Sequence, residues 1–512
     1  MTSKESHDRH GSETLQQAST LWKLGRFDEA LSVYQEAVRR SPNDFRTLIE
    51  ASRALGHRYR MEQSIALLKR AARLGPRRAD IQHAIGETYG KLHLPGEAEI
   101  HFRKACRLDG HPRSLFELAK LSERRHAIDE ADELVTRVLR GSPNSLDALI
   151  LRARLQRRRG DVGSAEALLT RLAAATPADS KELSQIYGEL STLLDEIGEF
   201  ERAWDAMLRC KAIQSNWEAA AWQAGQFVTN RFRQLIDSIT PQHFANWKSC
   251  APDESCANLA ILTGFPRSGT TLLDQVLDAH PAIVSIEEVE AFNDEAFLWL
   301  GQGYPPDAPI LNMLEQQSPE RIVVARERYL RAMGSLAGSA LDNRMLIDKN
   351  PAFNLLIPVF RKLFPETKLI VALRDPRDVV LSCFLRHLAI NPVSVWFLTL
   401  ERTVERYLID VSAWLKLREM TDEWVEVRYE DVVADMPVQA ARTLDALGIP
   451  WDDAVLDYRQ SARAGRVASP TYEAVAKPLY VSSIGRWHNY KRWLEPVLDT
   501  LAPMVKALGY EV

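Results

Sequence analysis

The hydrophobic pattern divides the chain into two parts that follow different periodicities. In the first part, apolar residues recur at helical spacing, as in Leu31, Tyr34 and Val38, which predicts amphipathic helices. From Asn258 onward, short apolar runs alternate with helical stretches. Alternation of that kind predicts a parallel sheet with helices on both faces. The expected fold class is therefore α followed by α/β.

A repeat of about 34 residues runs through the first part. One small residue recurs in each copy, at steps of 34, 34, 33, 34 and 38 residues: Ala30, Ser64, Ala98, Ala131, Ala165 and Ala203. Four prolines follow small residues by twelve positions, where the second helix of a copy should stop: Pro42, Pro76, Pro143 and Pro177. The pattern resembles the tetratricopeptide repeat, with about six copies over residues 12–215, and implies an all-α solenoid.

The concave surface of such a solenoid could hold a peptide or protein partner. The Arg-rich stretch 152–159 and the pair Arg124 and Arg125 could line that groove, or could be solvated helix faces. Residues 216–257 are expected to form connecting helices and a linker, which leaves residues 258–512 as the second domain.

Five apolar runs in the second domain predict strands, and helical stretches lie between most of them. We expect strands over 259–263, 283–286, 344–347, 369–373 and 424–428, and helices over 272–279, 355–363, 379–387 and 438–447. Ligands of open parallel sheets bind at the carboxyl ends of the strands. The residues that directly follow these runs are therefore the candidates for a functional site.

A loop bounded by glycines follows the first predicted strand and leads into a helix. Its sequence, GFPRSGTT over residues 264–271, has the G-x4-G spacing of a P-loop. Unpaired amides and the helix dipole make such a helix start favourable for a phosphate. Thr270 replaces the Walker lysine of an ATPase, and the cation lies inside the loop as Arg267. We expect a 5′-phosphate site for a nucleotide that does not transfer a Mg-bound γ-phosphate.

A second group of cations follows the strand predicted over residues 369–373. Ser382 and Arg386 would share one helix face at i, i+4, with Arg374 at the strand end beside them. Two guanidinium groups and a hydroxyl suit a second phosphate. The alternative is a structural salt-bridge cluster that uses Asp375 and Asp378.

The pairing of GFPRSGTTLL with VALRDPRDVVLS resembles the sulfotransferases that use 3′-phosphoadenosine-5′-phosphosulfate (PAPS), most closely the tyrosylprotein-sulfotransferase-like branch. The resemblance covers residues 259 to about 490 and implies a P-loop-like α/β domain. A nucleotide with phosphates at both ends needs two anion sites, whereas ATP needs one. The resemblance assigns the 5′-phosphosulfate to Arg267, Ser268, Gly269, Thr270 and Thr271, and the 3′-phosphate to Arg374, Ser382 and Arg386.

The same resemblance carries catalytic roles onto this chain. It places the catalytic base at Glu288, with Glu287 as a near alternative, because a carboxylate must accept the acceptor's proton as the S–O bond forms. Strand-end surface charge, including Glu290, is the other interpretation of these acids. Lys349 and Arg267 are implied to neutralise charge on the sulfuryl oxygens.

Three further positions complete the implied site. Tyr429 follows the last predicted strand, where the family's tyrosine lies against the adenine; core packing is the alternative. Thr471 takes the position of the family's transition-state-stabilising serine, and Arg486 that of a basic phosphate contact. Two departures concern this segment: threonine replaces the common serine, and Ala474 stands where many relatives have glutamine.

Composition limits the classes of function that remain. A chain of 512 residues is too long for one ordinary core, and its net charge of −4 argues against a dedicated nucleic-acid binder. The polar N-terminus lacks the pattern of a secretory signal. No apolar run approaches the roughly 18 residues of a membrane span. Five scattered cysteines, with Cys250 and Cys256 as ordinary thiols, predict a cytoplasmic protein.

Together these patterns predict a PAPS-dependent sulfotransferase that acts on an acceptor hydroxyl and releases 3′-phosphoadenosine-5′-phosphate (PAP). The acceptor could be a protein tyrosine, a carbohydrate or a small molecule. We expect no metal, because no acidic strand end of the Walker-B kind accompanies the loop. The alternatives are a P-loop kinase, which needs the lysine that Thr270 replaces, and a non-catalytic scaffold with a relic nucleotide fold.

Overall fold

The computed structural model describes residues 3–249, 258–338, 344–459 and 481–511. Their contacts form two compact units, of which the first comprises Met1–Ala148 with Tyr329–Gly338, and the second Leu149–Arg328 with Ser339–Val512. Cys250, Cys256, Thr471 and Ala474 lie outside the described residues. Among the helices in the described ranges, none is both long enough and apolar enough to cross a membrane.

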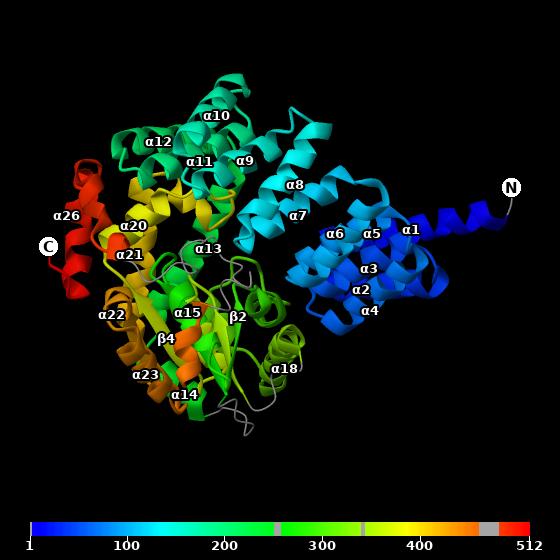
Figure 1. Ribbon diagram of the computed structural model, residues 1–512. Helices are drawn as coiled ribbons and strands as arrows, with labels where there is room; N and C mark the ends of the chain where they lie inside the picture. Colours follow the sequence, from blue (N-terminus) through cyan, green and yellow to red (C-terminus); the bar gives the residue numbers. More distant parts are fainter. Residues whose placement is uncertain (1–2, 250–257, 339–343, 460–480, 512) are drawn as a thin grey trace. The chain divides into compact units, whose positions relative to one another are not determined.

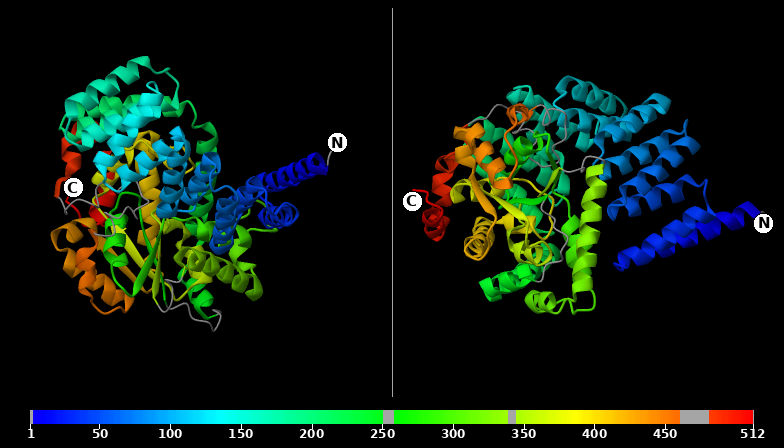
Figure 2. Two further views of the ribbon diagram at one scale, coloured as in Figure 1. Left: turned by 45° about the vertical axis from the view of Figure 1, so that its right-hand side comes forward. Right: turned by 90° about the horizontal axis from the view of Figure 1, so that it is seen from below.

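Helical hairpins build the first unit, each made of two helices joined by a short turn (Figure 2). The helices are α1 (Ser3–Lys23), α2 (Phe27–Arg40), α3 (Phe45–His57), α4 (Met61–Leu74), α5 (Ala79–Lys91), α6 (Pro95–Asp109), α7 (Pro112–Arg124) and α8 (Ile128–Gly141). The recurring small residues are fully buried, because the two helices of a hairpin approach closely at these positions: Ala30, Ser64, Ala98 and Ala131.

The repeat pattern continues into the second unit through α9 (Leu146–Arg158), α10 (Val162–Ala175), α11 (Lys181–Glu196) and α12 (Phe200–Ser215). Ala165 and Ala203 are again fully buried. The second helices that precede the four prolines each end two residues before the proline, at Arg40, Leu74, Gly141 and Ala175. The predicted helical repeats are confirmed.

Several arginines of the repeats form ion pairs with acids of neighbouring helices. Arg154 of α9 pairs with Glu189 of α11, and Arg157 pairs with Glu196. In the first unit, Arg125 lies 2.5 Å from Glu99. These pairs show what the arginines contact within the solenoid, and binding of a peptide in a groove stays a prediction.

Five parallel strands form the sheet of the second unit, in the order β2-β3-β1-β4-β5. Figure 1 labels two of them, β2 and β4. They are β1 (Leu259–Gly264), β2 (Ile283–Glu287), β3 (Met345–Lys349), β4 (Lys368–Leu373) and β5 (Trp424–Arg428). The five predicted strands are confirmed, with boundaries that differ by at most two residues.

Helices cover both faces of this sheet. One face packs on α15 (Thr270–Asp278), α22 (Tyr429–Ala434) and α23 (Met436–Leu447), with Val425 and Val427 of β5 in the shared core. Glu426, between those valines, points to the opposite face, where its carboxylate accepts a hydrogen bond from Trp414 Nε1 at 2.8 Å. Trp414 belongs to α21 (Leu400–Leu417), so α21 covers that second face.

The remaining helices of this half are α13 (Ala219–Ser238), α14 (Pro241–Ser249), α16 (Leu298–Leu300), α17 (Ile310–Glu315), α18 (Pro319–Ala337), α19 (Ile357–Leu363), α20 (Pro376–Phe384) and α26 (Lys491–Ala507). The helix predicted over 355–363 begins as a 3-10 turn, Asn354–Leu356, before α19. The helix predicted over 379–387 ends earlier, at Phe384.

Candidate active site

All five parallel strands deliver candidate residues to one edge of the sheet, as expected for carboxyl ends of parallel strands. The residues are the loop 265–269 after β1, Glu288 after β2, Lys349 at the end of β3, Arg374 after β4 and Tyr429 after β5. Lys349 lies in register with Leu262 of β1 and with Glu287 of β2. That register places a lysine and a carboxylate on adjacent strands.

The loop between β1 and α15 requires glycine at both ends. Gly264 has φ +147°, and a Cβ there would lie 2.4 Å from the carbonyl oxygen of Ala372. Gly269 has φ +96°, and a Cβ there would lie 2.7 Å from the ring of Tyr429. Arg267 adopts φ +75° without being a glycine. Such backbone strain is typical of functional sites.

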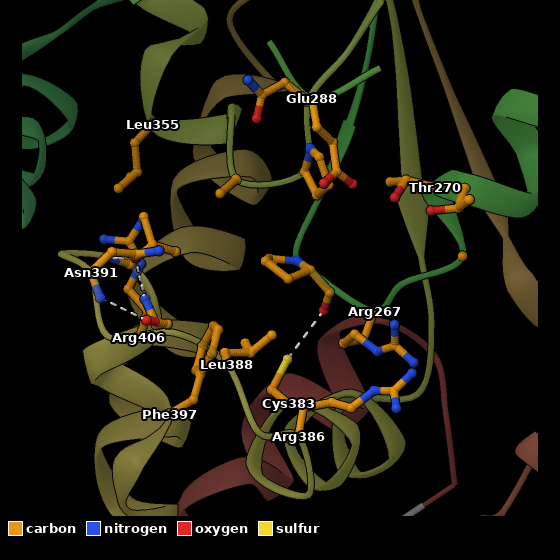
Figure 3. A pocket seen from close by; sticks show the side chains of 18 of the residues that line it. Arg267, Thr270, Glu288, Leu355, Cys383, Arg386, Leu388, Asn391, Phe397 and Arg406 are labelled. Atoms are coloured by element: carbon orange, nitrogen blue, oxygen red, sulfur yellow. Dashed lines mark hydrogen bonds between the residues drawn. The ribbon is translucent and has the colours of Figure 1, made fainter. Parts of the chain in front are cut away.

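A cavity of about 850 Å³ opens at this edge of the sheet (Figure 3). Eight of the predicted site residues line it: Arg267, Gly269, Thr270, Thr271, Glu288, Arg374, Arg386 and Tyr429. Ser268, Ser382 and Lys349 are buried and are not among the lining residues. The structure therefore gathers the predicted residues of both motifs around one space.

The two predicted phosphate sites are joined by direct hydrogen bonds. Arg267 Nε donates to Ser382 Oγ at 3.0 Å, and Arg374 Nη1 donates to the carbonyl oxygen of Arg267 at 3.2 Å. The side chains of Arg267 and Arg386 point toward the same part of the cavity (Figure 3). Arg374 Nε is buried and has no hydrogen-bond partner among the described residues. Clustered cations with an unmet donor fit an anionic ligand.

Two acids that follow Arg374 in the sequence form ion pairs and hydrogen bonds of their own. Asp375 accepts hydrogen bonds from Arg377 Nε at 3.0 Å and Nη2 at 2.8 Å. Asp378 accepts from the amides of Gly485 and Trp487, both at 2.8 Å, and lies 3.8 Å from Arg374. Burial raises the pKa of Asp378, although Arg374 and the two amides oppose that rise. Both acids of the salt-bridge alternative therefore form ion pairs, Asp375 with Arg377 and Asp378 with Arg374, while Arg374 also lines the cavity.

Lys349 joins the candidate base to the loop. Its Nζ donates to Glu288 Oε1 at 2.5 Å, Glu287 Oε1 at 3.1 Å and Thr271 Oγ1 at 3.3 Å. Burial lowers the pKa of Lys349, but the carboxylates of Glu287, Glu288 and Asp274 together raise it above the ordinary value. Lys349 is therefore held as a cation between two carboxylates and the start of α15.

The two adjacent glutamates differ in their surroundings. Glu287 ends β2 with a side chain only 11% exposed, whereas the side chain of Glu288 is 33% exposed and lines the cavity. Glu288 has φ +51°, and its amide donates to the carbonyl oxygen of Lys349 at 2.8 Å. The geometry favours Glu288 over Glu287 as the group that meets a ligand.

One buried acid behind Lys349 was not predicted. Asp274, in the first turns of α15, accepts a hydrogen bond from Ser285 Oγ and is almost fully buried. Burial is the largest effect on its carboxyl and raises the pKa to about 7, against an attractive contribution from Lys349. An isolated Asp inside a helical pattern carries no sequence signal for such a role.

The three remaining predicted site residues differ in where the structure places them. Tyr429 lies against the loop, with the guanidinium of Arg374 4.8 Å from its ring centre. Thr471 lies outside the described residues. The structure does not bring Arg486 to the cavity, because its guanidinium pairs with Asp195 of α11 at 2.7 Å. Asp195 also accepts from the hydroxyl of Tyr490 at 2.7 Å.

The expected helix through Arg386 is a second correction. After α20 ends, Lys211 Nζ of α12 donates to the carbonyl oxygen of Arg386 at 2.6 Å, and Gln214 Nε2 donates to that of Leu388 at 2.7 Å. Arg386 therefore follows the helix instead of sharing a face with Ser382. Burial lowers the pKa of Lys211 to about 8. The last repeat thus holds the backbone that carries Arg386.

Comparison with known proteins supports two kinds of domain. Residues 260–453 match the sulfotransferase family, and residues 15–79 and 116–180 match the tetratricopeptide repeat. A protein of Aquifex aeolicus, described as uncharacterized, is 23% identical over 62% of this chain and 41% of its own length. The protein-tyrosine sulfotransferase A of Caenorhabditis elegans is 27% identical over 49% of this chain and 67% of its own length.

Two further matches each cover about half of this chain. The protein-tyrosine sulfotransferase 1 of Danio rerio is 27% identical over 49% of this chain and 72% of its own length. The sulfotransferase domain of the Synechococcus PCC 7002 olefin synthase, a solved structure, is 22% identical with a TM-score of 0.34 and covers 46% of this chain and 90% of that one. The chain thus spans well under half of the Aquifex relative and about two thirds of the nematode enzyme.

Proposed function

Because the chain joins tetratricopeptide repeats to a domain of the sulfotransferase family, we propose that it transfers a sulfuryl group from PAPS to an acceptor hydroxyl. One observation supports this most directly. The loop of Arg267 and the cluster of Arg374 and Ser382 are linked by hydrogen bonds at the cavity that Glu288 also lines.

The cationic part of the cavity fits a nucleotide with phosphates at both ends. The loop residues Arg267 to Thr271, at the start of α15, would hold the 5′ end, where helix amides favour an anion. Arg374, Ser382 and Arg386 would hold the 3′-phosphate, and Arg374 Nε is a buried donor that needs an acceptor. The ring of Tyr429, beside Arg374, is placed for the adenosine.

Glu288 is proposed to accept the proton of the acceptor. PAPS supplies an activated sulfuryl group on its 5′-phosphate. As the acceptor oxygen bonds to sulfur, its proton passes to the carboxylate of Glu288, and the S–O bond to the nucleotide breaks with release of PAP. Glu288 Oε1 is held by Lys349, which leaves Oε2 to face the incoming hydroxyl.

Lys349 is proposed both to hold the base, Glu288, and to stabilise charge on the sulfuryl group. Its contacts with Glu288 and Thr271 place one positive charge between the base and the anion site. A fixed cation there stabilises charge that develops as the bridging oxygen leaves, an effect commonly worth 10²–10³ in rate. The cationic loop residue Arg267 would act on the same charge.

The full chain can test this proposal in two steps. PAP should raise the melting temperature, and Mg-ATP should not, because Thr270 replaces the lysine that an ATP site needs. The chain should then transfer ³⁵S from labelled PAPS to a hydroxyl acceptor. A response to Mg-ATP in place of PAP would contradict the nucleotide assignment. A response to PAP with no transfer to any acceptor would indicate a non-catalytic scaffold.

A further inference from the structure

The cavity has a second, apolar end that none of the sequence motifs covers. Its walls come from α13, from the turn before α19 and from residues 388–397. The apolar lining residues there are Val228, Phe232, Leu355, Leu356, Leu388 and Phe397. In Figure 3, Leu355, Leu388 and Phe397 lie across the cavity from Thr270, and Glu288 reaches in between the two sides.

Two of the apolar residues that line the cavity at this end have exposed side chains. Val228 is 45% exposed and Val393 is 43% exposed, and both line the cavity. At Gly225, α13 packs directly on residues 388–397, because a Cβ there would lie 2.5 Å from the carbonyl oxygen of Pro392. Exposed apolar groups in a cavity lining favour an apolar occupant, since its binding removes their surface from water.

The charged groups at this end disfavour the binding of an acidic ligand. Arg406 is the cation there among the described lining residues, and its Nη1 donates to Thr229 Oγ1 at 2.6 Å. Its Nη2 lies 3.7 Å from Asp410, whose carboxylate is buried with it. Glu288 and Glu290 also line the cavity. An acidic peptide would therefore meet carboxylates, and the nearby guanidinium already has a buried counter-charge.

The polar groups at this end are also largely hydrogen-bonded within the chain. Asn391 Oδ1 accepts hydrogen bonds from the backbone amides of Val393 and Ser394, at 2.8 and 2.9 Å. The backbone amide of Asn391 donates to Ser394 Oγ at 2.9 Å. A sugar ring needs several hydrogen-bond partners to replace its water. The polar groups of Asn391 and Ser394 instead stabilise the turn that they belong to, which disfavours a sugar at this end.

We propose that the apolar end receives a small acceptor whose hydroxyl is carried on an uncharged aryl or alkyl group. The inference rests on the proposed function, because the apolar group would lie against the apolar lining residues of α13 and of residues 388–397 while its hydroxyl meets Glu288. The total cavity, about 850 Å³, lies within the range of small-molecule sites. The acceptor oxygen bonds to sulfur, its proton goes to Glu288, and the electron pair of the broken S–O bond leaves with PAP.

A competition among acceptors tests the class of substrate. The full chain with ³⁵S-labelled PAPS is offered 2-naphthol, 1-octanol, a tyrosine peptide flanked by glutamates, and a disaccharide. We expect label on the naphthol or the octanol, with kcat/KM at least tenfold above that for the peptide and the disaccharide. Preferential labelling of the peptide or the disaccharide overturns the inference, although the proposed function stands. Failure of PAP to bind overturns the proposed function itself.

A matched pair of variants on α13 tests the site. Val228 and Phe227 are neighbours with nearly equal exposure, 45% and 44%, and of the two only Val228 lines the cavity. Val228→Asp should raise KM for the neutral acceptor about tenfold or more, because a charge enters an apolar wall. Its PAP affinity should not change, and Phe227→Asp should resemble the parent. Equal effects of the two variants, or no effect of Val228→Asp, would overturn the location.

Discussion

The two ends of the cavity are built in different ways. The cationic end is built mainly where parallel strands end, so the sheet register fixes where Arg267, Lys349 and Arg374 lie. The apolar end is assembled mainly from α13 and residues 388–397, which are at least 150 positions apart in the chain. In the proposed function, the sheet edge would supply the chemistry, and segments that are distant in the sequence would select the acceptor. Four variants test this division, in order of decreasing effect.

Glu288→Gln should have the largest effect on turnover. The amide keeps the shape of the side chain but cannot accept the proton, so transfer of ³⁵S should fall by about 10²–10⁴-fold. The Kd for PAP, measured by calorimetry, should stay within about threefold, because the nucleotide is assigned to other residues. Glu290→Gln, on the same cavity, is the control. A loss of PAP binding would move Glu288 to the nucleotide site.

Lys349→Met should reduce stability as well as turnover. The variant leaves Glu287 and Glu288 next to a buried apolar side chain, and breaking a buried pair in this way commonly costs about 3 kcal/mol. Urea unfolding of the full chain measures the change. Lys506→Met, on the exposed face of α26, should change the free energy of unfolding by less than about 0.5 kcal/mol. Equal stability of the two variants would contradict the assigned role.

Arg386→Ala should weaken PAP binding without changing the binding of a nucleotide that lacks the 3′-phosphate. Loss of a charge-assisted hydrogen bond should raise the Kd for PAP about 10- to 100-fold. Arg486→Ala is the matched control, because that guanidinium pairs with Asp195 and does not line the cavity. If Arg486→Ala weakened PAP as much as Arg386→Ala, the correction made for Arg486 would be wrong.

Lys211→Met should have the smallest effect of the four. Lys211, in the last repeat, donates a hydrogen bond to the carbonyl oxygen of Arg386. Because the variant removes about one hydrogen bond, the Kd for PAP should rise only a few-fold. It acts as a positioning residue: kcat at saturating PAPS should be retained. Lys181→Met, on exposed α11 surface, is the control. An unchanged Kd in Lys211→Met would show that the repeats do not support the nucleotide site.

The sequence predicted the elements whose signals are local. The repeat positions such as Ala30 and Ala203, the five strands and the glycine-bounded loop all depend on spacing along the chain or on backbone conformations that only certain residues allow. Because parallel strands end at one edge, the motif residues could also be expected to meet. The gathering of Arg267, Arg374 and Glu288 around one cavity agrees with that expectation.

The missed features depend on contacts between distant segments. Nothing near Lys211 in the sequence indicates that α12 would hold the segment after α20, and this contact accompanies the early end of that helix. Arg486 was assigned from its position in a family motif, but motif position does not reveal that Asp195 lies within reach of its guanidinium. Val228 carries no chemical signal at all, because an apolar residue on a helix usually indicates core packing.

The central claim is that one ligand spans two phosphate sites, and calorimetric titration of the full chain with PAP and with adenosine 5′-monophosphate tests it most directly. Because Arg374 and Arg386 line the cavity and would both contact the 3′-phosphate, we predict that PAP binds at least about a hundredfold more tightly. Equal affinities for the two nucleotides would contradict the account, since the 3′-phosphate would then have no site.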